Sequence, residues 1–172
     1  MEKTHLFDVI CKKKLFKKIG AYEFGVEVGL DSHRRKNRSG KIMENRVYED
    51  IVASGFVENK TFFCQKKLRD VCAELNIDIS NLNHNSRLYK KAPDFIIKGQ
   101  NYIYIVECNY YSKTGSKPLE VVTAYQKLQE QIRSIGNLKF IWITDGQGWK
   151  EMKNAIEESW NSFDAIYNLY LI

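Results

Sequence analysis

Two short apolar runs, residues 95 to 97 and 102 to 106, restrict the fold of this chain more than any other feature. They flank the pair Gly99-Gln100, and a two-residue connection with glycine first is a common signal for a tight hairpin. If these two residues form the turn, the numbers of facing residues sum to 199, and Asp94 lies opposite Ile105. The pattern therefore predicts two antiparallel strands over residues 92 to 109.

Two acidic residues lie near the open end of this predicted hairpin. Glu107 is two residues beyond Ile105, so Glu107 and Asp94 project from one face as diagonal neighbours. Two carboxylates at the ends of apolar strands repel each other and resist desolvation, whereas a hard divalent ion such as Mg²⁺ favours carboxylate oxygens. The pair predicts a magnesium site with Asn109 on the same face. Carboxyl groups turned apart, or a cationic side chain filling the gap between them, would argue against it.

The rest of the chain alternates between helical and strand patterns. Apolar residues at helical spacing predict helices over residues 42 to 53, 66 to 76 and 118 to 135, and another that contains Met152 and Phe163. Strands are predicted over residues 138 to 144 and 165 to 172, and the Asn- and Ser-rich residues 77 to 90 are predicted to be irregular. The 172 residues therefore predict one α/β domain with a mixed sheet flanked by helices.

The net charge of +6 lies entirely in residues 1 to 41, which contain 11 basic and 5 acidic side chains. Residues 6 to 19 have the pattern of an amphipathic basic helix, and residues 29 to 41 have no apolar periodicity, which predicts an exposed basic loop. A concentrated positive field attracts phosphates, so nucleic acid is the favoured partner, although a solvated basic face is the simpler alternative for either segment.

The four cysteines show no paired CxxC spacing, and no signal peptide precedes them. The longest apolar runs are far shorter than the ~20 residues that cross a bilayer. We therefore expect a reduced, soluble, cytoplasmic protein.

The arrangement of Pro93-Asp94 followed by Glu107-x-Asn109 resembles the PD-(D/E)-x-K nuclease superfamily, with Asn in the position of the usual Lys. Three further segments make the resemblance more specific. These are GVEVGLDSHRRKNRSGKIMEN at residues 25 to 45, ECNYYSKTGSK at 107 to 117 and WITDGQGW at 142 to 149. Together they are similar to the DpnII/MboI family of type II restriction endonucleases over about residues 20 to 172. The chain resembles the catalytic, C-terminal portion of that family.

This resemblance implies a restriction endonuclease-like α/β fold and hydrolysis of double-stranded DNA at GATC with Mg²⁺, leaving 5′-phosphate ends. It implies that Asp94 and Glu107 hold the metal, that Asn109 orients the attacking water, and that Glu44 approaches from a helix as a third acid. The alternative for Glu44 is an ordinary residue in the first turn of that helix.

Basic residues are expected to bind the DNA. The candidates in the basic loop are Arg34, Arg35, Lys36, Arg38 and Lys41, and those after the second acidic strand are Lys113 and Lys117. Because the implied site is palindromic, we expect a homodimer, and the implied partner in the host is a cognate adenine methyltransferase. Two other functions remain open: a non-catalytic or truncated DNA-binding module, and a nuclease of the same fold with a different site or structure preference.

Overall fold

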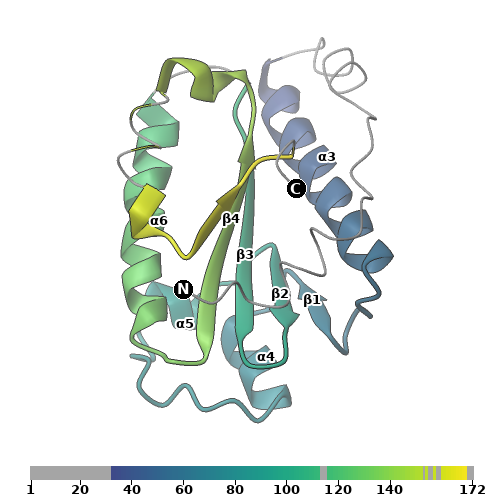
Figure 1. Cartoon of the computed structure of the whole chain (residues 1–172), viewed down its shortest axis with the longest axis vertical. Helices are drawn as coiled ribbons and strands as arrows, with labels where there is room; N and C mark the ends of the chain where they lie inside the picture. Colours follow the sequence, from purple (N-terminus) through teal and green to yellow (C-terminus); the bar gives the residue numbers. More distant parts are fainter. Residues whose placement is uncertain (1–31, 113–115, 153, 155–156, 158–159, 170–172) are drawn as a thin grey trace.

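The computed structural model describes residues 32–112, 116–152, 154, 157 and 160–169. Its centre is a mixed five-stranded sheet in the order β1-β2-β3-β4-β5 (Figure 1). The first three strands pair antiparallel, and the last two pairings are parallel. The strands are β1 (Phe62–Cys64), β2 (Phe95–Lys98), β3 (Ile103–Tyr110), β4 (Leu138–Asp145) and β5 (Ala165–Tyr167). The predicted mixed sheet flanked by helices is confirmed.

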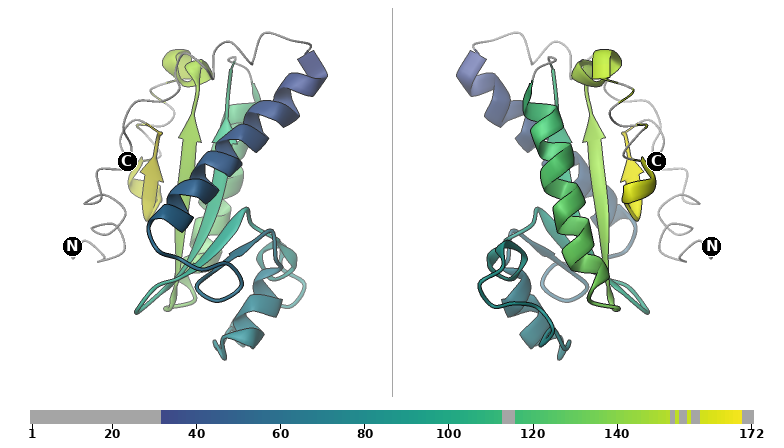
Figure 2. Two further views of the ribbon diagram at one scale, coloured as in Figure 1. Left: turned by 90° about the vertical axis from the view of Figure 1, so that its right-hand side faces the viewer. Right: turned by 90° about the vertical axis from the view of Figure 1, so that its left-hand side faces the viewer.

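Two long helices cover opposite faces of the sheet. Helix α3 (Ser32–Ala53) lies in front of the sheet in one view of Figure 2, and helix α6 (Ser116–Arg133) lies in front in the other. Successive strand residues point to opposite faces, so Ile96 packs in the cluster with α6 while Phe95 packs in the cluster with α3. The parallel pair β3 and β4 requires a crossover connection, which α6 supplies.

Shorter elements complete the fold. Helix α4 (Leu68–Glu74) confirms the helix predicted over residues 66 to 76, whereas helix α5 (Arg87–Lys90) lies in a segment predicted to be irregular. Strand β1 was not predicted, because three residues are too few to show a period. The segment after β4 contains two 3₁₀ turns, η1 (Gln147–Met152) and η2 (Trp160–Ser162). Within the described ranges, no helix combines the length and apolar character that a membrane span requires.

The predicted basic loop over residues 29 to 41 is wrong from Ser32 onward, because α3 begins there. Arg and Lys are good helix formers, and Gly40 costs only about 1 kcal/mol relative to Ala. Burial of Met43 and Val47 against the sheet stabilises the helix that continues beyond this glycine. Glu44 therefore lies within a helix and not in its first turn. Residues 29–31 and the predicted helix over residues 6 to 19 lie outside the described residues.

The two antiparallel strands of the hairpin are confirmed, but the predicted register is wrong by two residues. Phe95 pairs with Val106, so the numbers of facing residues sum to 201. Asp94, which immediately precedes β2, therefore lies opposite Glu107 and not opposite Ile105. The parity of the register is unchanged, and the two acids still share one face.

The position of Gly99 explains this difference. Its N–H donates to the carbonyl of Tyr102 at 2.9 Å, so Gln100 and Asn101 are the central residues of the turn. A Cβ at position 99 would lie 2.6 Å from Cε2 of Tyr104, and Gly99 is not among the described glycines with a positive φ. Glycine is needed here to make room for an aromatic ring, and it does not act as the first central residue of the turn.

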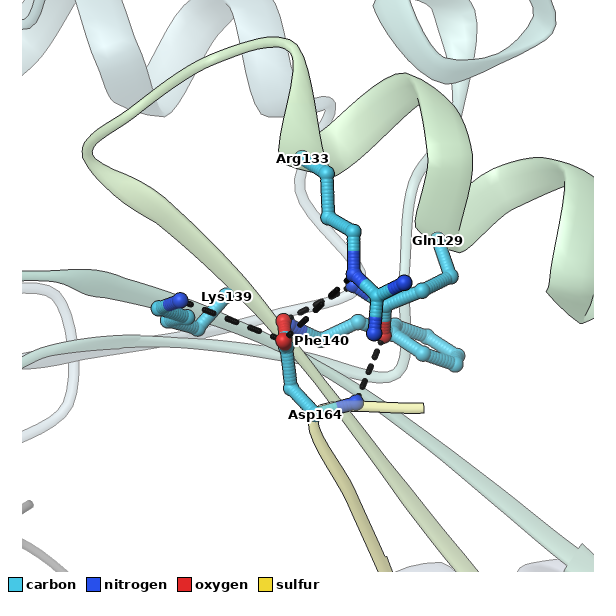
Figure 3. Close-up of polar contacts among 5 residues, drawn as sticks. All are labelled: Gln129, Arg133, Lys139, Phe140 and Asp164. Carbon is cyan, nitrogen blue, oxygen red and sulfur yellow. Dashed lines mark hydrogen bonds and ion pairs between the residues drawn. The ribbon is translucent and has the colours of Figure 1, made fainter. Parts of the chain in front are cut away.

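Asp164, just before β5, connects α6, β4 and β5 (Figure 3). Its Oδ2 accepts hydrogen bonds from Nε2 of Gln129 at 2.8 Å and from the N–H of Phe140 at 3.1 Å. Its own N–H donates to Oε1 of Gln129 at 2.9 Å, so both ends of this fully buried amide are satisfied. Arg133 and Lys139 lie farther away, each 3.9 Å from Oδ1. The network fixes α6 against the sheet.

Gly146, just after β4, is the glycine whose replacement we expect to be most disruptive. Its φ is +117°, and a Cβ there would collide with the backbone carbonyl of Tyr111. We therefore expect Gly146→Ala to lower the free energy of unfolding by about 2 kcal/mol or more, measured by urea denaturation. Gly136→Ala is the control, because nothing lies within 4 Å of its added Cβ. Equal effects of the two substitutions would contradict this assignment.

Candidate active site

The predicted acidic residues lie together where β2 begins and β3 ends. Asp94 and Glu107 face each other in the observed register, and Asn109 follows two residues later on the same strand. These three positions alternate with residues that pack towards α3, so they belong to the sheet face that α6 covers. The two carboxyl groups lie close enough to interact, because the Glu107 charge raises the pKa of Asp94.

Asp94 is a half-buried carboxylate with one strong backbone contact. The N–H of Cys108 donates to its Oδ2 at 2.7 Å. Burial raises the pKa of Asp94 to about 7, and the nearby Glu107 carboxylate raises it as well, whereas the Cys108 N–H lowers it. Desolvation and like charge are therefore stronger than the hydrogen bond, and a proton or a cation would stabilise this group.

Glu107 is buried and is contacted from two sides. The hydroxyl of Tyr125, on α6, donates to Oε2 at 2.9 Å. The ammonium of Lys91 lies 3.0 Å from Oε1, although Oε1 has no hydrogen bond of good geometry within the described part of the chain. No ion pair joins Lys91 to Asp94 among the described residues. The charge of this ammonium nevertheless acts on both carboxylates, because Lys91 also lowers the pKa of Asp94.

The amide of Asn109 has a defined orientation. Nε1 of Trp142 donates to its Oδ1 at 3.0 Å, and because an indole nitrogen can only donate, the amide oxygen must face Trp142. The NH₂ group is the part of Asn109 that remains for other partners. The ring of Trp142 also meets that of Tyr125 edge to face, with centroids 5.3 Å apart. One aromatic pair thus contacts both Glu107 and Asn109 of β3.

Glu44 reaches this end of the sheet from α3. Nε2 of Gln65 donates to Oε2 of Glu44 at 3.2 Å, and the N–H of Gln65 donates to the carbonyl of Asp94 at 3.1 Å. Gln65 therefore connects the two acids, and the Glu44 charge contributes to the raised pKa of Asp94. Lys41, which is exposed, lies 3.5 Å from the same Oε2.

The carboxylate pair fits a hard divalent cation that keeps most of its waters. Within the described ranges, no group of three or more His, Cys, Asp or Glu side chains has the arrangement of a metal site. Mg²⁺ is often bound by only one or two carboxylates together with water and phosphate oxygens, so a third protein ligand is not required. Glu107 Oε1 is buried without a hydrogen bond, and the one ammonium supplies a single positive charge beside two carboxylates. The site can therefore accept further positive charge.

The structure describes most, but not all, of the residues that are predicted to bind DNA. Lys117 lies in the first turn of α6, and Lys113 lies outside the described residues. The four residues Arg34, Arg35, Lys36 and Arg38 lie on the first part of α3, the helix that also contains Lys41 and Glu44.

Sequence reasoning did not find three residues that contact the acids: Gln65, Lys91 and Tyr125. Tyr125 was visible only as one apolar position of a predicted helix. Lys91 precedes Asp94 by three residues, and Gln65 belongs to a strand end that showed no period. No sequence pattern distinguishes Lys91 from its neighbour Lys90, because only the packing of α5 against α4 and α6 brings one of them to Glu107.

Comparisons with known proteins identify the family of this chain. The model of the DpnII restriction endonuclease family matches residues 1–172. The chain is 34% identical over 169 residues to the type II restriction enzyme DpnII of Streptococcus pneumoniae, covering 98% of this chain and 58% of that protein. It is 36% identical over 172 residues to the type II restriction enzyme MboI of Moraxella bovis, covering 100% of this chain and 56% of that protein.

A third relative is the type II restriction enzyme MjaIII of Methanocaldococcus jannaschii, 35% identical over 176 residues, with 99% of this chain and 58% of the relative covered. The chain thus spans less than two thirds of the length of these relatives. The match nevertheless includes every residue described above for the acidic site. The chain belongs to the DpnII restriction endonuclease family.

Proposed function

We propose that this chain carries the catalytic centre of a type II restriction endonuclease that hydrolyses phosphodiesters of double-stranded DNA at GATC with Mg²⁺. The observation that carries the proposal is the desolvated pair of Asp94 and Glu107 at the end of β2 and β3, in a chain of this family. The GATC preference rests on the resemblance of three sequence segments, and the magnesium requirement rests on the chemistry of the two carboxylates.

In this proposal Asp94 and Glu107 hold the metal, which when bound lowers the pKa of water and neutralises charge on the phosphate. The Cys108 N–H holds Asp94, and the Tyr125 hydroxyl holds Glu107, so neither carboxylate has to reorient. Burial raises the pKa of the Tyr125 hydroxyl, which keeps it protonated and able to donate.

Asn109 contributes through its NH₂ group, because its amide oxygen accepts from Trp142. The group can donate to the oxygen of an attacking water or to a phosphate oxygen, but it cannot accept a proton. Glu44 is the third acid, tied to Asp94 through Gln65, and we propose that it adds negative field at the metal.

Residues Arg34, Arg35, Lys36 and Arg38 on α3, with Lys41, are proposed to contact DNA. A helix fits the major groove, where Arg can bind guanine through two hydrogen bonds, and phosphate contacts would fix its position. Lys113 and Lys117 follow the acidic strand and are proposed to contact the backbone beside the cut. We also propose a homodimer, since a palindromic site needs two cuts, and a cognate adenine methyltransferase in the host.

Plasmid digestion tests the reaction and its specificity. We expect the purified protein with Mg²⁺ to convert an unmethylated plasmid into fragments that end at GATC, and chelator to prevent this. A plasmid methylated at GATC adenines measures the influence of the proposed methyltransferase. Salt-dependent DNA binding without any cleavage would indicate a non-catalytic module instead. Fragments with ends at unrelated sequences would contradict the GATC preference.

Substitution of the carboxylates tests the site. We expect Asp94→Asn and Glu107→Gln each to lower the single-turnover cleavage rate by at least about a hundredfold, because each removes a charge that holds the metal. Asp70→Asn is the matched control, since Asp70 is exposed on α4 and forms an ion pair with Arg69. Thermal unfolding of each variant distinguishes lost chemistry from lost structure. Full activity of both site variants would remove the proposed centre.

Removal of the Tyr125 hydroxyl tests whether this residue positions Glu107. We expect Tyr125→Phe to slow single-turnover cleavage about tenfold and to raise the Mg²⁺ concentration needed for half-maximal rate, with DNA affinity unchanged. Tyr48→Phe is the control, because the Tyr48 hydroxyl donates to the exposed Glu58 instead. An unchanged Mg²⁺ dependence in Tyr125→Phe would show that Glu107 does not need this donor.

A further inference from the structure

Lys91 is a partly buried cation in the acidic site that the proposed chemistry does not yet use. Its side chain is 19% exposed, and its ammonium lies 3.0 Å from Oε1 of Glu107, whose side chain is 8% exposed. Burying a charge in this way is costly unless a partner compensates it. The position of the Lys91 ammonium is therefore not that of a solvated surface lysine, and we expect a function that uses its charge.

The backbone around Lys91 holds the residue in place. Its N–H donates to the carbonyl of Leu88 at 3.1 Å, and its carbonyl accepts from the N–H of Leu68 at 3.0 Å. Both of these leucines are fully buried in the cluster beneath α6. Lys91 is thus anchored between α4 and α5, three residues before Asp94, and its position relative to Glu107 is set by the core.

Glu107 lies within ion-pair distance of the Lys91 ammonium but forms no hydrogen bond of good geometry with it. Oε1 is buried but has no hydrogen bond of good geometry in the described part of the chain, although Lys91 is within ion-pair distance. The other oxygen, Oε2, is satisfied by Tyr125. The ammonium can therefore donate to a further acceptor at this carboxylate without losing an established hydrogen bond.

A count of charges indicates what that acceptor is. Asp94 and Glu107 contribute two negative charges and Lys91 one positive charge. A divalent cation would make the sum +1, and one phosphodiester group would then make the site neutral. Without the ammonium, the two carboxylates and the cation would sum to zero, and the phosphodiester would leave an uncompensated charge of −1 in a partly desolvated site.

The other residues near the pair do not supply this charge. Asn109 is uncharged, and Glu44 adds a negative charge whose ion-pair partner Lys41 is exposed. Within the described ranges, Lys91 is the cation paired with an acid of the central pair.

We propose that Lys91 is a substrate-binding residue of the active site, whose ammonium contacts the scissile phosphate beside Glu107. This rests on the proposed nuclease function and adds to it a residue that no sequence motif marks. An ammonium at this position neutralises charge that develops on the phosphate oxygens during hydrolysis.

The test is Lys91→Met, with Lys91→Gln as a second uncharged variant and Lys91→Arg as the variant that keeps the charge. We expect Lys91→Met and Lys91→Gln to slow single-turnover cleavage at saturating Mg²⁺ by about a hundredfold, and Lys91→Arg to recover part of that loss. Lys90→Met is the matched control, because Lys90 is exposed on α5 and its rate should not change.

A second measurement distinguishes a phosphate contact from a structural ion pair. Mn²⁺ binding, measured by calorimetry, should be as tight or tighter in Lys91→Met, because an ammonium that competes for Glu107 is gone. Slower cleavage with undiminished Mn²⁺ affinity supports the proposal. A wild-type rate at saturating Mg²⁺, or a loss of rate accompanied by an equal loss of Mn²⁺ affinity in both uncharged variants, overturns it.

The outcomes also separate this inference from the proposed function. If the unaltered chain cleaves DNA and Asp94→Asn does not, while Lys91→Met and Lys91→Gln cleave at the wild-type rate, only the role of Lys91 is wrong. If the unaltered chain cleaves no duplex, the proposed function fails and the role of Lys91 fails with it.

Discussion

The pairing of β2 with β3 places two carboxylates opposite each other at the edge of an apolar core, and the rest of the site depends on this. Phe95 and Val106 set the register, so Asp94 faces Glu107. Burial and mutual repulsion then make the charged form of Asp94 unfavourable, with a pKa raised to about 7. Keeping two carboxylates together in a desolvated position lowers the stability of the fold, and it creates a site where positive charge is strongly favoured.

The surroundings of the pair explain how the fold tolerates it. A backbone N–H, a tyrosine hydroxyl and a lysine ammonium each contact one carboxylate oxygen. The tyrosine depends in turn on the position of α6, which the hydrogen bonds between Gln129 and Asp164 fix against β4 and β5 one turn further along the helix (Figure 3). The orientation of Glu107, on the central strand β3, therefore depends on a network near the edge strand β5.

Helix α3 connects the two kinds of charge in this protein. Its first part contains the basic cluster of the sequence, and its middle brings Glu44 to Asp94 through Gln65. Because Met43 and Val47 pack on the sheet face opposite α6, the helix is held relative to the acids. In the proposed function, this arrangement couples DNA binding at the start of α3 to the position of an acid at the catalytic centre.

The sequence by itself determined the elements whose patterns are local. Helical spacing over Val121 and Leu128, the apolar strands on either side of Gly99, and the even spacing of Glu107 and Asn109 were sufficient to predict a mixed sheet with both acids on one face. Three separated segments were sufficient to indicate the family. The strand and helix patterns can be read from the sequence because side-chain periods of 2 and 3.6 follow directly from backbone geometry.

Only the tertiary structure decided the details on which the chemistry depends. The register differs from the prediction because Gly99 hydrogen-bonds to Tyr102 and the turn centres on Gln100 and Asn101. The basic segment is helical because Met43 and Val47, which follow it on the same helix, are buried. Lys91, Gln65 and Tyr125 reach the acids from three separate parts of the fold. Such contacts depend on how the helices pack on the sheet. The packing of separate elements produces no periodic pattern in the sequence, so these contacts could not be predicted from it.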